Sequence, residues 1–417
     1  EVVLGIGGVR MLDALEVDVK KYHLNEGHAS LLTVELLRKS KRDIEKVWDE
    51  RLQWDDESVR ERCVFTTHTP VAAGHDKFGY DVVHQVLGDT VDMNLLKELA
   101  GDDALNMTML ALNLSRYVNG VAKKHGEVSQ NMFEGYAIHA ITNGIHSHTW
   151  TADAFKQLYD RYIPGWANEP ELFVRVDNIP DAEIWDTHQT CKGQLVDYCR
   201  ENAGVELDPE VLTIGFARRS ATYKRADLIF SDLERLRQIG GGKLQIVYAG
   251  KAHPADTQGK ELIQRVFHSL KELDGDIQGV FLPGYDMKLA SVLVPGVDVW
   301  LNNPIRPQEA SGTSGMKAAH NGVPNFSVLD GWWIEGHIEE VTGWSIGPEA
   351  TEVSLTERND DADLEDLYHK LEHLLIPTYY DDRQKWISIM KGAIGKNAYY
   401  FNTHRMMRRY VTEAYLP

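Results

Sequence analysis

The chain has 417 residues, 43% of them hydrophobic, which is enough for two domains with ordinary globular cores. Its formal net charge of −19 argues against nucleic acid or an anionic membrane surface as a partner, so any anion site must be locally basic. The 3 cysteines include no CxxC pair and no apolar run is long enough to span a membrane, so a cytoplasmic protein without a disulfide framework is expected.

The start of the chain is unusual for a complete protein. Glu1 leads directly into apolar residues and the run Gly-Ile-Gly-Gly at residues 5–8, without an initiator methionine. We interpret this start as a segment cut from a longer protein. The glycine run is a weak match to a dinucleotide site, because the third spaced glycine and the later acidic residue are missing.

Short apolar runs alternate with longer helical patterns, which predicts βα units and parallel sheets. Strands are predicted at residues 2–4, 63–66, 137–142, 212–216, 244–249, 279–282, 297–301 and 324–328. Helices are predicted at residues 30–48, 105–125, 181–202, 226–240, 355–374 and 381–415. The segment 145–179 has weak periodicity and several Trp, Pro and Asp residues, which indicates a linker between two sheets.

The most informative motif is EASGTSGMK at residues 309–317, a small-residue turn with Lys317 in a short predicted helix. Backbone N–H groups at a helix start, together with the hydroxyls of Ser311 and Thr313, suit a phosphate group. A lysine beside a phosphate acts as a plain cation or, when its amine is neutral, as a nucleophile toward a carbonyl. Taken alone, the motif leaves a glycine-rich loop with a solvated lysine as an equal alternative.

Seven segments, in this order, resemble the α-glucan phosphorylases (glycogen, starch and maltodextrin phosphorylases), especially their short bacterial and archaeal branch. They are VVLGIGGVR (2–10), HLNEGHASL (23–31), FTTHTPVAAGHDKF (65–78), ITNGIHSHTW (141–150), FARRSATYKRADL (216–228), YAGKAHP (248–254) and the lysine motif. The resemblance covers nearly the whole chain.

This resemblance implies an α/β fold of two Rossmann-like domains of the glycosyltransferase-B type, the first incomplete at its N-terminus. Residues 1–145 would form the C-terminal portion of the glucan-binding domain. Residues 146–417 would form the pyridoxal-phosphate-binding domain, with residues 378–417 helical and packing back on the first domain. Homodimers are frequent in the family, and a homodimer is therefore one expectation for this protein.

The family's cofactor is pyridoxal 5'-phosphate, and the resemblance implies that Lys317 bonds to it covalently. Thr313 would hold its phosphate, and Tyr223 and Tyr285 match tyrosines near the cofactor. Arg219 and Lys224 match the cations that let the cofactor phosphate and the substrate phosphate lie side by side. Such cations are physically required, because two dianions repel strongly in a partly dry cleft. The alternative is a solvated basic face at residues 218–225.

The resemblance also assigns contacts with the sugar. The matching residues are Glu26, His28, His68, Asn143, Glu309, Ser311 and Gly312. His68 and Asn143 have structural alternatives, as a partly buried histidine and as a turn residue. A zinc site is not expected, because His23 and His28 are five positions apart and lack the intervening glutamate. Trp332 and Trp333 either line the cleft or are buried in the core.

The implied reaction is phosphorolysis of terminal α-1,4-glucosidic bonds of a glucan by orthophosphate, with release of glucose 1-phosphate and retention of configuration. One alternative is a nucleotide-sugar glucosyltransferase of the glycogen or starch synthase kind. Such enzymes tend to have a second glutamate eight positions after the first, where this chain has Lys317. A second alternative is a non-catalytic glucan-binding protein. An aminotransferase-type enzyme is disfavoured, because the chain shows no acidic partner for the pyridine nitrogen.

Overall fold

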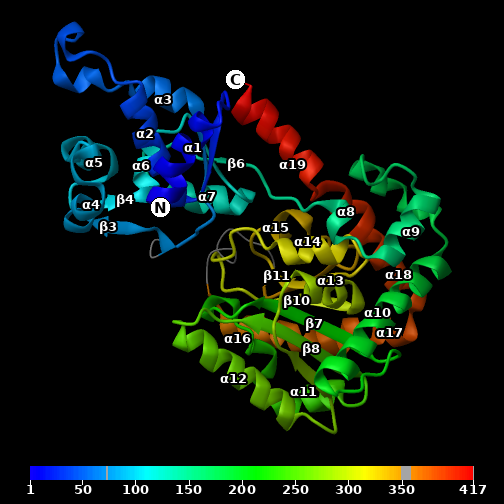
Figure 1. The fold of residues 1–417 in the computed structure, drawn as a ribbon. Helices are drawn as coiled ribbons and strands as arrows, with labels where there is room; N and C mark the ends of the chain where they lie inside the picture. The colour runs from blue at the N-terminus through cyan, green and yellow to red at the C-terminus, as the bar shows by residue number, and fades with distance from the viewer. Residues whose placement is uncertain (72–73, 349–357, 417) are drawn as a thin grey trace. The chain divides into compact units, whose positions relative to one another are not determined.

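Six parallel strands form the sheet of the second part of the chain. The computed structural model describes residues 1–71, 74–348 and 358–416 (Figure 1). The strands are Leu212–Arg219 (β7), Leu244–Lys251 (β8), Gln278–Leu282 (β9), Val299–Asn302 (β10), Asn325–Val328 (β11) and Gly343–Ile346 (β12). Their order is β12-β11-β10-β7-β8-β9, which is the doubly wound Rossmann order. The order reverses between β7 and β10, so a crevice is expected at the carboxyl ends of these two strands.

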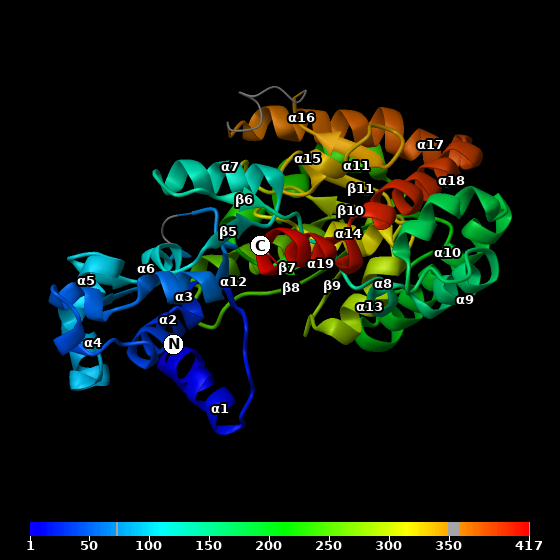
Figure 2. The ribbon, with the colours of Figure 1, turned by 90° about the horizontal axis from the view of Figure 1, so that it is seen from above.

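Both faces of this sheet are buried. On β8, Ile246 and Tyr248 belong to one core cluster, whereas Val247 and Ala249 belong to another. Successive side chains of a strand point to opposite faces, so a strand covered on both sides is apolar throughout. Figures 1 and 2 show α13 and α16 on opposite sides of the sheet. The predicted strands at residues 212–216, 244–249, 279–282, 297–301 and 324–328 are confirmed as β7 to β11 within one or a few residues.

The helices around this sheet begin and end at recognisable signals. Asp181–Ala203 (α10) begins after Pro180 and ends at Gly204 in the left-handed region, and it confirms the helix predicted at residues 181–202. The other α-helices are Ser147–Trp150 (α8), Asp153–Tyr162 (α9), Leu233–Gly240 (α11), Thr257–Glu272 (α12), Met287–Gly296 (α13), Thr313–Ala319 (α14), Trp333–Gly336 (α15), Asp360–Lys370 (α16), Ile376–Asp381 (α17), Arg383–Gly392 (α18) and Thr403–Arg409 (α19).

The first part of the chain has its own parallel sheet. Its strands are Tyr22–Asn25 (β1), Cys63–Thr66 (β2), Tyr117–Gly120 (β5) and His139–Ala140 (β6), in the order β1-β2-β5-β6. Lys77–Gly79 (β3) and Ala104–Asn106 (β4) form a small antiparallel pair. The helices are Gly8–Ala14 (α1), Leu31–Lys39 (α2), Asp56–Arg62 (α3), Tyr80–Leu87 (α4), Met93–Ala100 (α5), Met107–Asn113 (α6) and Lys123–Met132 (α7). Both sheets therefore confirm the predicted α/β class.

The chain divides into two units, Glu1–Thr142 with Arg408–Pro417 and Asn143–Met407. The division lies close to the border predicted between residues 145 and 146. Of the predicted helical segment 378–417, residues 378–407 belong to the second unit and only the last ten belong with the first. The assignment of one unit to glucan and the other to the cofactor stays a prediction. In the described part of the chain, no helix has the length and apolar character needed to cross a bilayer.

The strand predicted at residues 2–4 is wrong. Val3–Gly7 is a π-helical turn that continues into α1. A Cβ atom on Gly5 would lie 2.8 Å from the backbone nitrogen of Leu32 in α2. Gly5, which belongs to the glycine run of the sequence, therefore permits a close approach between two helices.

Three other predictions of local structure are corrected. The segment 145–179 is not a linker, because α8, α9 and the 3-10 helix Pro170–Asn178 bury Phe155, Trp166 and Phe173 in the core. Short helices and 3-10 turns leave no sustained helical period in the sequence. The helix predicted at residues 105–125 ends at Asn113, since the strand β5 that follows pairs with β2. The helix predicted at residues 355–374 begins at Asp360, and residues 355–357 lie outside the described residues.

Candidate active site

Two polar segments follow β7 and β10, at the crevice that the strand order predicts. Residues 218–225 end β7 and include the 3-10 turn Thr222–Lys224. Residues 302–317 end β10 and lead into α14. The backbone N–H of Ile305 donates to the carbonyl oxygen of Tyr223 at 2.7 Å, which joins the two segments. The topology of the sheet therefore brings together the two motifs that carry most of the predicted site residues.

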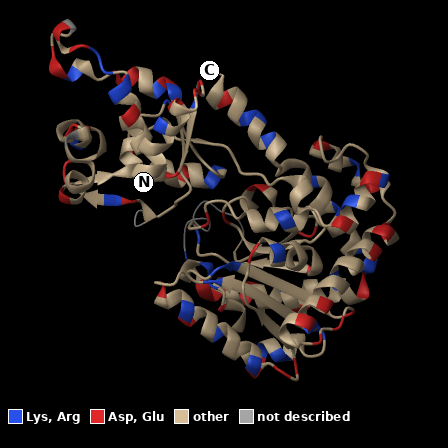
Figure 3. Ribbon diagram, viewed as in Figure 1, with Lys and Arg blue, Asp and Glu red and all other residues tan. Residues whose placement is uncertain are grey.

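A buried carboxylate, that of Glu309, lies between two cations. Arg218 Nη2 donates to Glu309 Oε2 at 2.5 Å, and Lys224 Nζ donates to Oε1 and Oε2 at 2.9 and 2.7 Å. Arg218 also donates to the side-chain oxygen of Asn302. All three charged side chains are at most 9% exposed. Figure 3 shows basic and acidic segments together at this edge of the sheet. When Lys224 is protonated, two cations with one carboxylate leave a positive charge here, in a chain whose net charge is −19.

The burial of this cluster changes the proton affinities of its members. Burial lowers the pKa of Lys224 to about 7, and the charge of Arg218 acts in the same direction while Glu309 opposes it. Burial by itself would raise the pKa of Glu309, but the charges of Arg218 and Lys224 lower it to about 2. Glu309 is therefore an anion at neutral pH, whereas the charge of Lys224 depends on small changes in pH or on a nearby anion.

Lys317 lies in the second half of α14, with its amine against an indole ring. Its Nζ atom lies 3.6 Å from the ring centroid of Trp150. The side chain is half-buried, and burial lowers its pKa. No carboxylate in the described residues forms an ion pair with it. Partial burial without a counter-ion favours the neutral amine, which is the form that attacks a carbonyl carbon, whereas the face of the indole ring favours the charged form.

The loop between Glu309 and α14 is shaped by a glycine. Gly312 has φ 91°, a left-handed conformation that suits glycine, and it immediately precedes Thr313, the first residue of α14. The hydroxyl of Ser311 is buried and has no hydrogen-bond partner in the described residues. A buried hydroxyl without a hydrogen-bond partner lowers the stability of the ligand-free protein, and a ligand oxygen would supply that partner.

Tyr223 and Tyr285 lie near the same cluster. Burial raises the pKa of each phenol to about 12, while the charge of Arg218 acts to lower both values. Lys224 Nζ lies 4.3 Å above the centroid of the Tyr223 ring. Arg219, by contrast, is exposed at the end of β7. The structure therefore brings Tyr223 and Lys224 together, places Tyr285 within the electrostatic influence of Arg218, and leaves Arg219 open to solvent.

Asn143 is the first residue of the second unit and is half-buried. Its backbone carbonyl accepts a hydrogen bond from Arg405 Nη2 at 2.9 Å. The next residue, Gly144, has the backbone of Asn402 where a Cβ atom would lie. The α19 region thus holds the backbone at Asn143, and the predicted amide contact with a sugar stays a prediction.

The other predicted sugar contacts belong to the first unit. Glu26 is buried with φ 64°, and its carboxylate accepts hydrogen bonds from the backbone N–H of His68 at 2.8 Å and from Thr67 Oγ1 at 3.2 Å. Burial raises the pKa of Glu26 and lowers that of His68, whose Nε2 atom is buried without a partner in the described residues. His28 is exposed, and its Nδ1 atom lies 2.9 Å from Asp76 Oδ2. Glu26 and His68 are thus neighbours, as a shared pocket requires.

The two histidines considered for zinc have different surroundings. His23 is within hydrogen-bond distance of Tyr415 and Thr66, at 2.6 and 2.7 Å. His28 forms a group with Glu1 and Asp76, whose potential ligand atoms lie within 4.8 Å of one another. This group is exposed or half-exposed, and exposed acidic groups of this kind are common without a metal.

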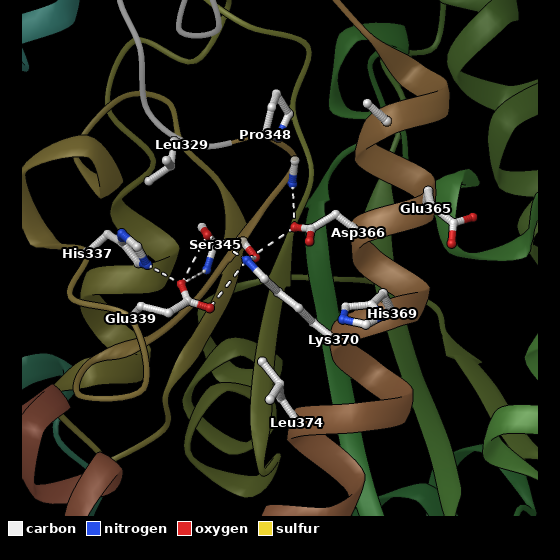
Figure 4. Close-up of a pocket in the computed structure, with 12 residues that line it drawn as sticks. Leu329, His337, Glu339, Ser345, Pro348, Glu365, Asp366, His369, Lys370 and Leu374 are labelled. Carbon is white, nitrogen blue, oxygen red and sulfur yellow. Dashed lines mark hydrogen bonds and ion pairs between the residues drawn. The ribbon is translucent and has the colours of Figure 1, made fainter.

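A separate cavity of about 850 Å³ lies between β12 and α16 (Figure 4). Its charged walls are paired among themselves. Glu339 accepts from His337 at 2.6 Å and lies 3.3 Å from Lys370, which in turn lies 3.1 Å from Asp366. None of the predicted site residues lines this cavity. A wall whose charges are already satisfied offers little to an incoming ligand, and we assign it no role.

Sequence reasoning missed three residues of this site. Arg218 is the buried partner of Glu309, and Trp150 is the partner of the Lys317 amine. Asp330 accepts a hydrogen bond from the backbone N–H of Glu309 at 2.8 Å. Arg218 and Asp330 lie at or just after the carboxyl ends of predicted strands, a position typical of ligand sites, so this signal was present in the sequence. The position of Trp150 depends on the tertiary fold.

A model of the carbohydrate phosphorylase family matches residues 88–377 of the chain. The chain belongs to the carbohydrate phosphorylase family. The matched region extends from the first unit into the second and contains the Arg218-Lys224-Glu309 cluster and Lys317. The resemblance inferred from the seven motifs is thereby confirmed.

Named relatives agree with this membership over all of the chain. A maltodextrin phosphorylase of Thermococcus litoralis is 40% identical, and the match covers 100% of this chain and 53% of the relative. A glycogen phosphorylase of Aquifex aeolicus is 37% identical with 65% of its length covered, and one of Mycobacterium tuberculosis is 36% identical with 54% covered. The chain therefore spans about half to two thirds of the length of these relatives.

Proposed function

We propose that this chain carries the cofactor and phosphate site of an α-glucan phosphorylase. The reaction is phosphorolysis of terminal α-1,4-glucosidic bonds of glycogen, starch or maltodextrin by orthophosphate, releasing α-D-glucose 1-phosphate with retention. Membership of the family and relatives named maltodextrin and glycogen phosphorylase support this reaction. Because the chain spans only part of those relatives, the activity of the whole protein is part of the proposal.

The observation that carries the proposal is the environment of Lys317. Its amine is half-buried against Trp150, has a lowered pKa, and forms no ion pair within the described residues. A structural lysine would be expected to have a carboxylate partner or full solvation. A half-buried amine with a lowered pKa beside a glycine-rich turn fits covalent attachment to the aldehyde of pyridoxal phosphate.

The other residues of the site fit the same cofactor. Lys317 would hold it covalently, and Thr313, Tyr223 and Tyr285 would contact it. The buried Ser311 hydroxyl is an unsatisfied group that a ligand oxygen would complete. When bound, the cofactor supplies a phosphate group whose second pKa is about 6, which suits proton exchange near neutral pH.

The chain's own cations would bind and orient orthophosphate. Arg219 is exposed at the end of β7, and Lys224 can gain a full positive charge when an anion approaches, since its pKa is about 7. Arg218 adds a permanent charge beside Lys224. Together these cations would offset the repulsion between two phosphate groups, and that is the electrostatic requirement of the reaction.

The residues that the family resemblance assigns to the sugar are Glu309, Ser311, Gly312, Asn143, Glu26, His28 and His68. Glu309 is an anion held by two cations, so its carboxylate oxygens have a fixed position and can accept hydrogen bonds from sugar hydroxyls. A cytoplasmic location agrees with the three free, buried cysteines. The homodimer expected from the family stays a prediction.

The test of the cofactor assignment needs only the 417-residue chain. The protein is incubated with pyridoxal phosphate, reduced with borohydride and digested, and the peptide containing Lys317 is weighed. We expect the mass of a pyridoxyl phosphate on Lys317, and none on the matching peptide of a Lys317→Ala variant. An unmodified Lys317 peptide from folded protein would contradict the proposal.

A second experiment separates cofactor binding from phosphorolysis. Arg219→Ala and Lys224→Ala variants should keep the modification at Lys317 but lose release of glucose 1-phosphate from maltodextrin and orthophosphate. Unchanged activity in these variants would remove them from the phosphate site. Binding of a nucleotide sugar in place of orthophosphate would favour the glucosyltransferase alternative, and a glucan complex without either activity would favour a binding protein.

A further inference from the structure

The turn Asp330-Gly331-Trp332 is buried directly behind the loop that carries Glu309 and leads to Lys317. It follows β11 and precedes α15, and the side chains of Asp330 and Trp332 are each 1% exposed. None of these three residues was assigned a role in the proposed reaction. They nevertheless contact the loop through hydrogen bonds and through close packing.

The first set of contacts consists of hydrogen bonds donated by backbone N–H groups. Asp330 Oδ2 accepts the N–H of Glu309 at 2.8 Å, and Asp330 Oδ1 accepts the N–H of Gly331 at the same distance. The N–H of Trp332 donates to the carbonyl oxygen of Ser311 at 2.9 Å. The Asp330 carboxylate therefore links the turn to the loop at Glu309. A backbone hydrogen bond links them again at Ser311, two residues later in the loop. Hydrogen bonds to a buried carboxylate are among the stronger ones in proteins.

The second set of contacts is steric. A Cβ atom on Gly331, whose φ is 54°, would lie 2.5 Å from the carbonyl oxygen of Ser311. Cβ atoms on Gly312 and Gly315 would lie 3.2 and 2.9 Å from ring atoms of Trp332. The indole thus fills the space behind the loop from Gly312 to Gly315, two residues before Lys317. Gly331 is needed because the Ser311 backbone is so close, and a side chain at Gly315 would meet both the ring and Asn325 Oδ1.

The ring of Trp332 also has a fixed position of its own. It packs against Phe401 with the ring centroids 4.7 Å apart, in a cluster that contains Met316, the neighbour of Lys317. Both tryptophans of the sequence pair are buried, Trp332 at 1% and Trp333 at 0% exposed, so they belong to the core and do not line a cleft. A rigid aromatic wall behind a glycine-rich loop restricts the conformations that the loop can adopt.

We propose that Asp330 and Trp332 are positioning residues of the active site: Asp330 holds Glu309 through its backbone N–H, and Trp332 holds the turn that presents Lys317. Neither residue needs to touch a substrate for this role. The part of the inference that concerns Lys317 rests on the proposed function, whereas the part that concerns the loop does not.

The first measurement is hydrogen exchange of the cofactor-free chain, followed by mass spectrometry of peptides. In an Asp330→Asn variant, the amide retains one acceptor oxygen and turns a donor toward the other N–H, so one of the two bonds is lost. Exchange in the peptide covering residues 307–316 should become about tenfold faster in Asp330→Asn and in Trp332→Phe. A peptide from β8 should keep its wild-type rate.

The matched control is Trp344→Phe. Trp344 is also fully buried in the second unit, but it lies on β12 and packs against Trp386 with ring centroids 5.5 Å apart. Its truncation should reduce the melting temperature about as much as Trp332→Phe and leave exchange in the loop unchanged. Loop exchange at the wild-type rate in both test variants would overturn the inference. So would an equal acceleration in Trp344→Phe.

The second measurement is affinity for pyridoxal phosphate, followed by its absorbance and by reduction at Lys317. We expect about tenfold weaker binding in Trp332→Phe and no change in Trp344→Phe. The double variant Asp330→Asn with Trp332→Phe should lose less than the product of the two single effects, because both act on one loop. A wild-type chain that binds no cofactor would contradict the proposed function. The hydrogen-exchange measurement would still decide whether Asp330 and Trp332 position the loop. Equal affinity in wild type and Trp332→Phe would overturn the role at Lys317 alone.

Discussion

Lys224 Nζ lies 2.7 Å from Glu309 Oε2, and both side chains are almost completely buried. A buried ion pair gains little net stability, because desolvation of the two charges offsets most of their attraction. With Arg218 as a second cation, we interpret this cluster as a buried site that holds positive charge away from solvent. Its members are coupled, so a change in one alters the protonation and the binding capacity of the others.

Glu309→Gln should destabilise the protein by about 3 kcal/mol, because it leaves the buried Arg218 side chain without its counter-ion and removes the anion that favours the charged form of Lys224. Urea unfolding followed by circular dichroism measures this loss. Glu365→Gln is the control, since Glu365 pairs with Arg235 at the surface and should cost less than about 1 kcal/mol. Added sulfate should stabilise Glu309→Gln more than wild type. Equal losses in the two variants would show that the buried cations need no anion.

Sulfate affinity should fall as the pH rises through about 7. Lys224 is a base whose pKa is lowered to about 7, so it is positive below that pH and neutral above it. Asp330, whose pKa burial raises to about 7, gains a negative charge in the same range and acts in the same direction. Glu309, whose pKa is lowered to about 2, stays negative across this range.

Titration calorimetry measures the affinity for sulfate about one pH unit below and about one pH unit above pH 7. The charge of sulfate itself is constant near neutral pH. Lys224→Met should bind sulfate more weakly below pH 7 and show a smaller decline with pH. A decline of the same size in wild type and variant would remove Lys224 as its source.

Lys317 should react with amine reagents at neutral pH faster than an exposed lysine. Its pKa is lowered by burial, so a larger fraction of the amine is neutral. Brief labelling with trinitrobenzenesulfonate and peptide mass spectrometry compares it with Lys288, which is exposed. Prior incubation with pyridoxal phosphate should protect Lys317 and leave Lys288 unchanged. Slower labelling of Lys317 at every pH would mean that burial blocks access and would weaken its role as a nucleophile.

Asp298 should stabilise the second unit in a way that depends on pH. It is fully buried, with its oxygens 2.8 Å from His188 Nε2 and 2.7 Å from Lys192 Nζ. Burial by itself would raise its pKa, but Lys192 and His188 lower it below the ordinary aspartate value. The contribution is therefore complete above the ordinary pKa of aspartate and is lost as the pH falls below it.

Asp298→Asn should reduce the free energy of unfolding by about 3 kcal/mol at neutral pH, because it removes one partner of a buried ion pair. The difference in the free energy of unfolding between variant and wild type should become smaller at acid pH. Urea unfolding at neutral and at acid pH measures this change. A difference that stays constant with pH would indicate that the loss comes from packing and not from the charge.

Much of the architecture followed from local patterns. The strands β7 to β11 have four to eight residues, are mostly apolar and lie between polar turns, and α10 has a proline before it and a glycine after it. Such signals act over a few residues and are visible in the sequence. The family and its lysine motif were also evident, because several short motifs occur in one order. The segment 145–179 was misjudged, since its helices are stabilised by burial of aromatic side chains that only the fold provides.

The sequence by itself determined which residues could carry the chemistry: Lys317, Lys224, Arg219 and Glu309 stand in motifs that can be read without a structure. Only the tertiary structure decided which of them meet. It paired Glu309 with Arg218 instead of leaving it free, placed the Lys317 amine on Trp150, and buried Asp330 and Trp332 behind the loop. The physical reason is that burial and charge pairing depend on neighbours tens to hundreds of residues away, and these set both the pKa and the position of each group.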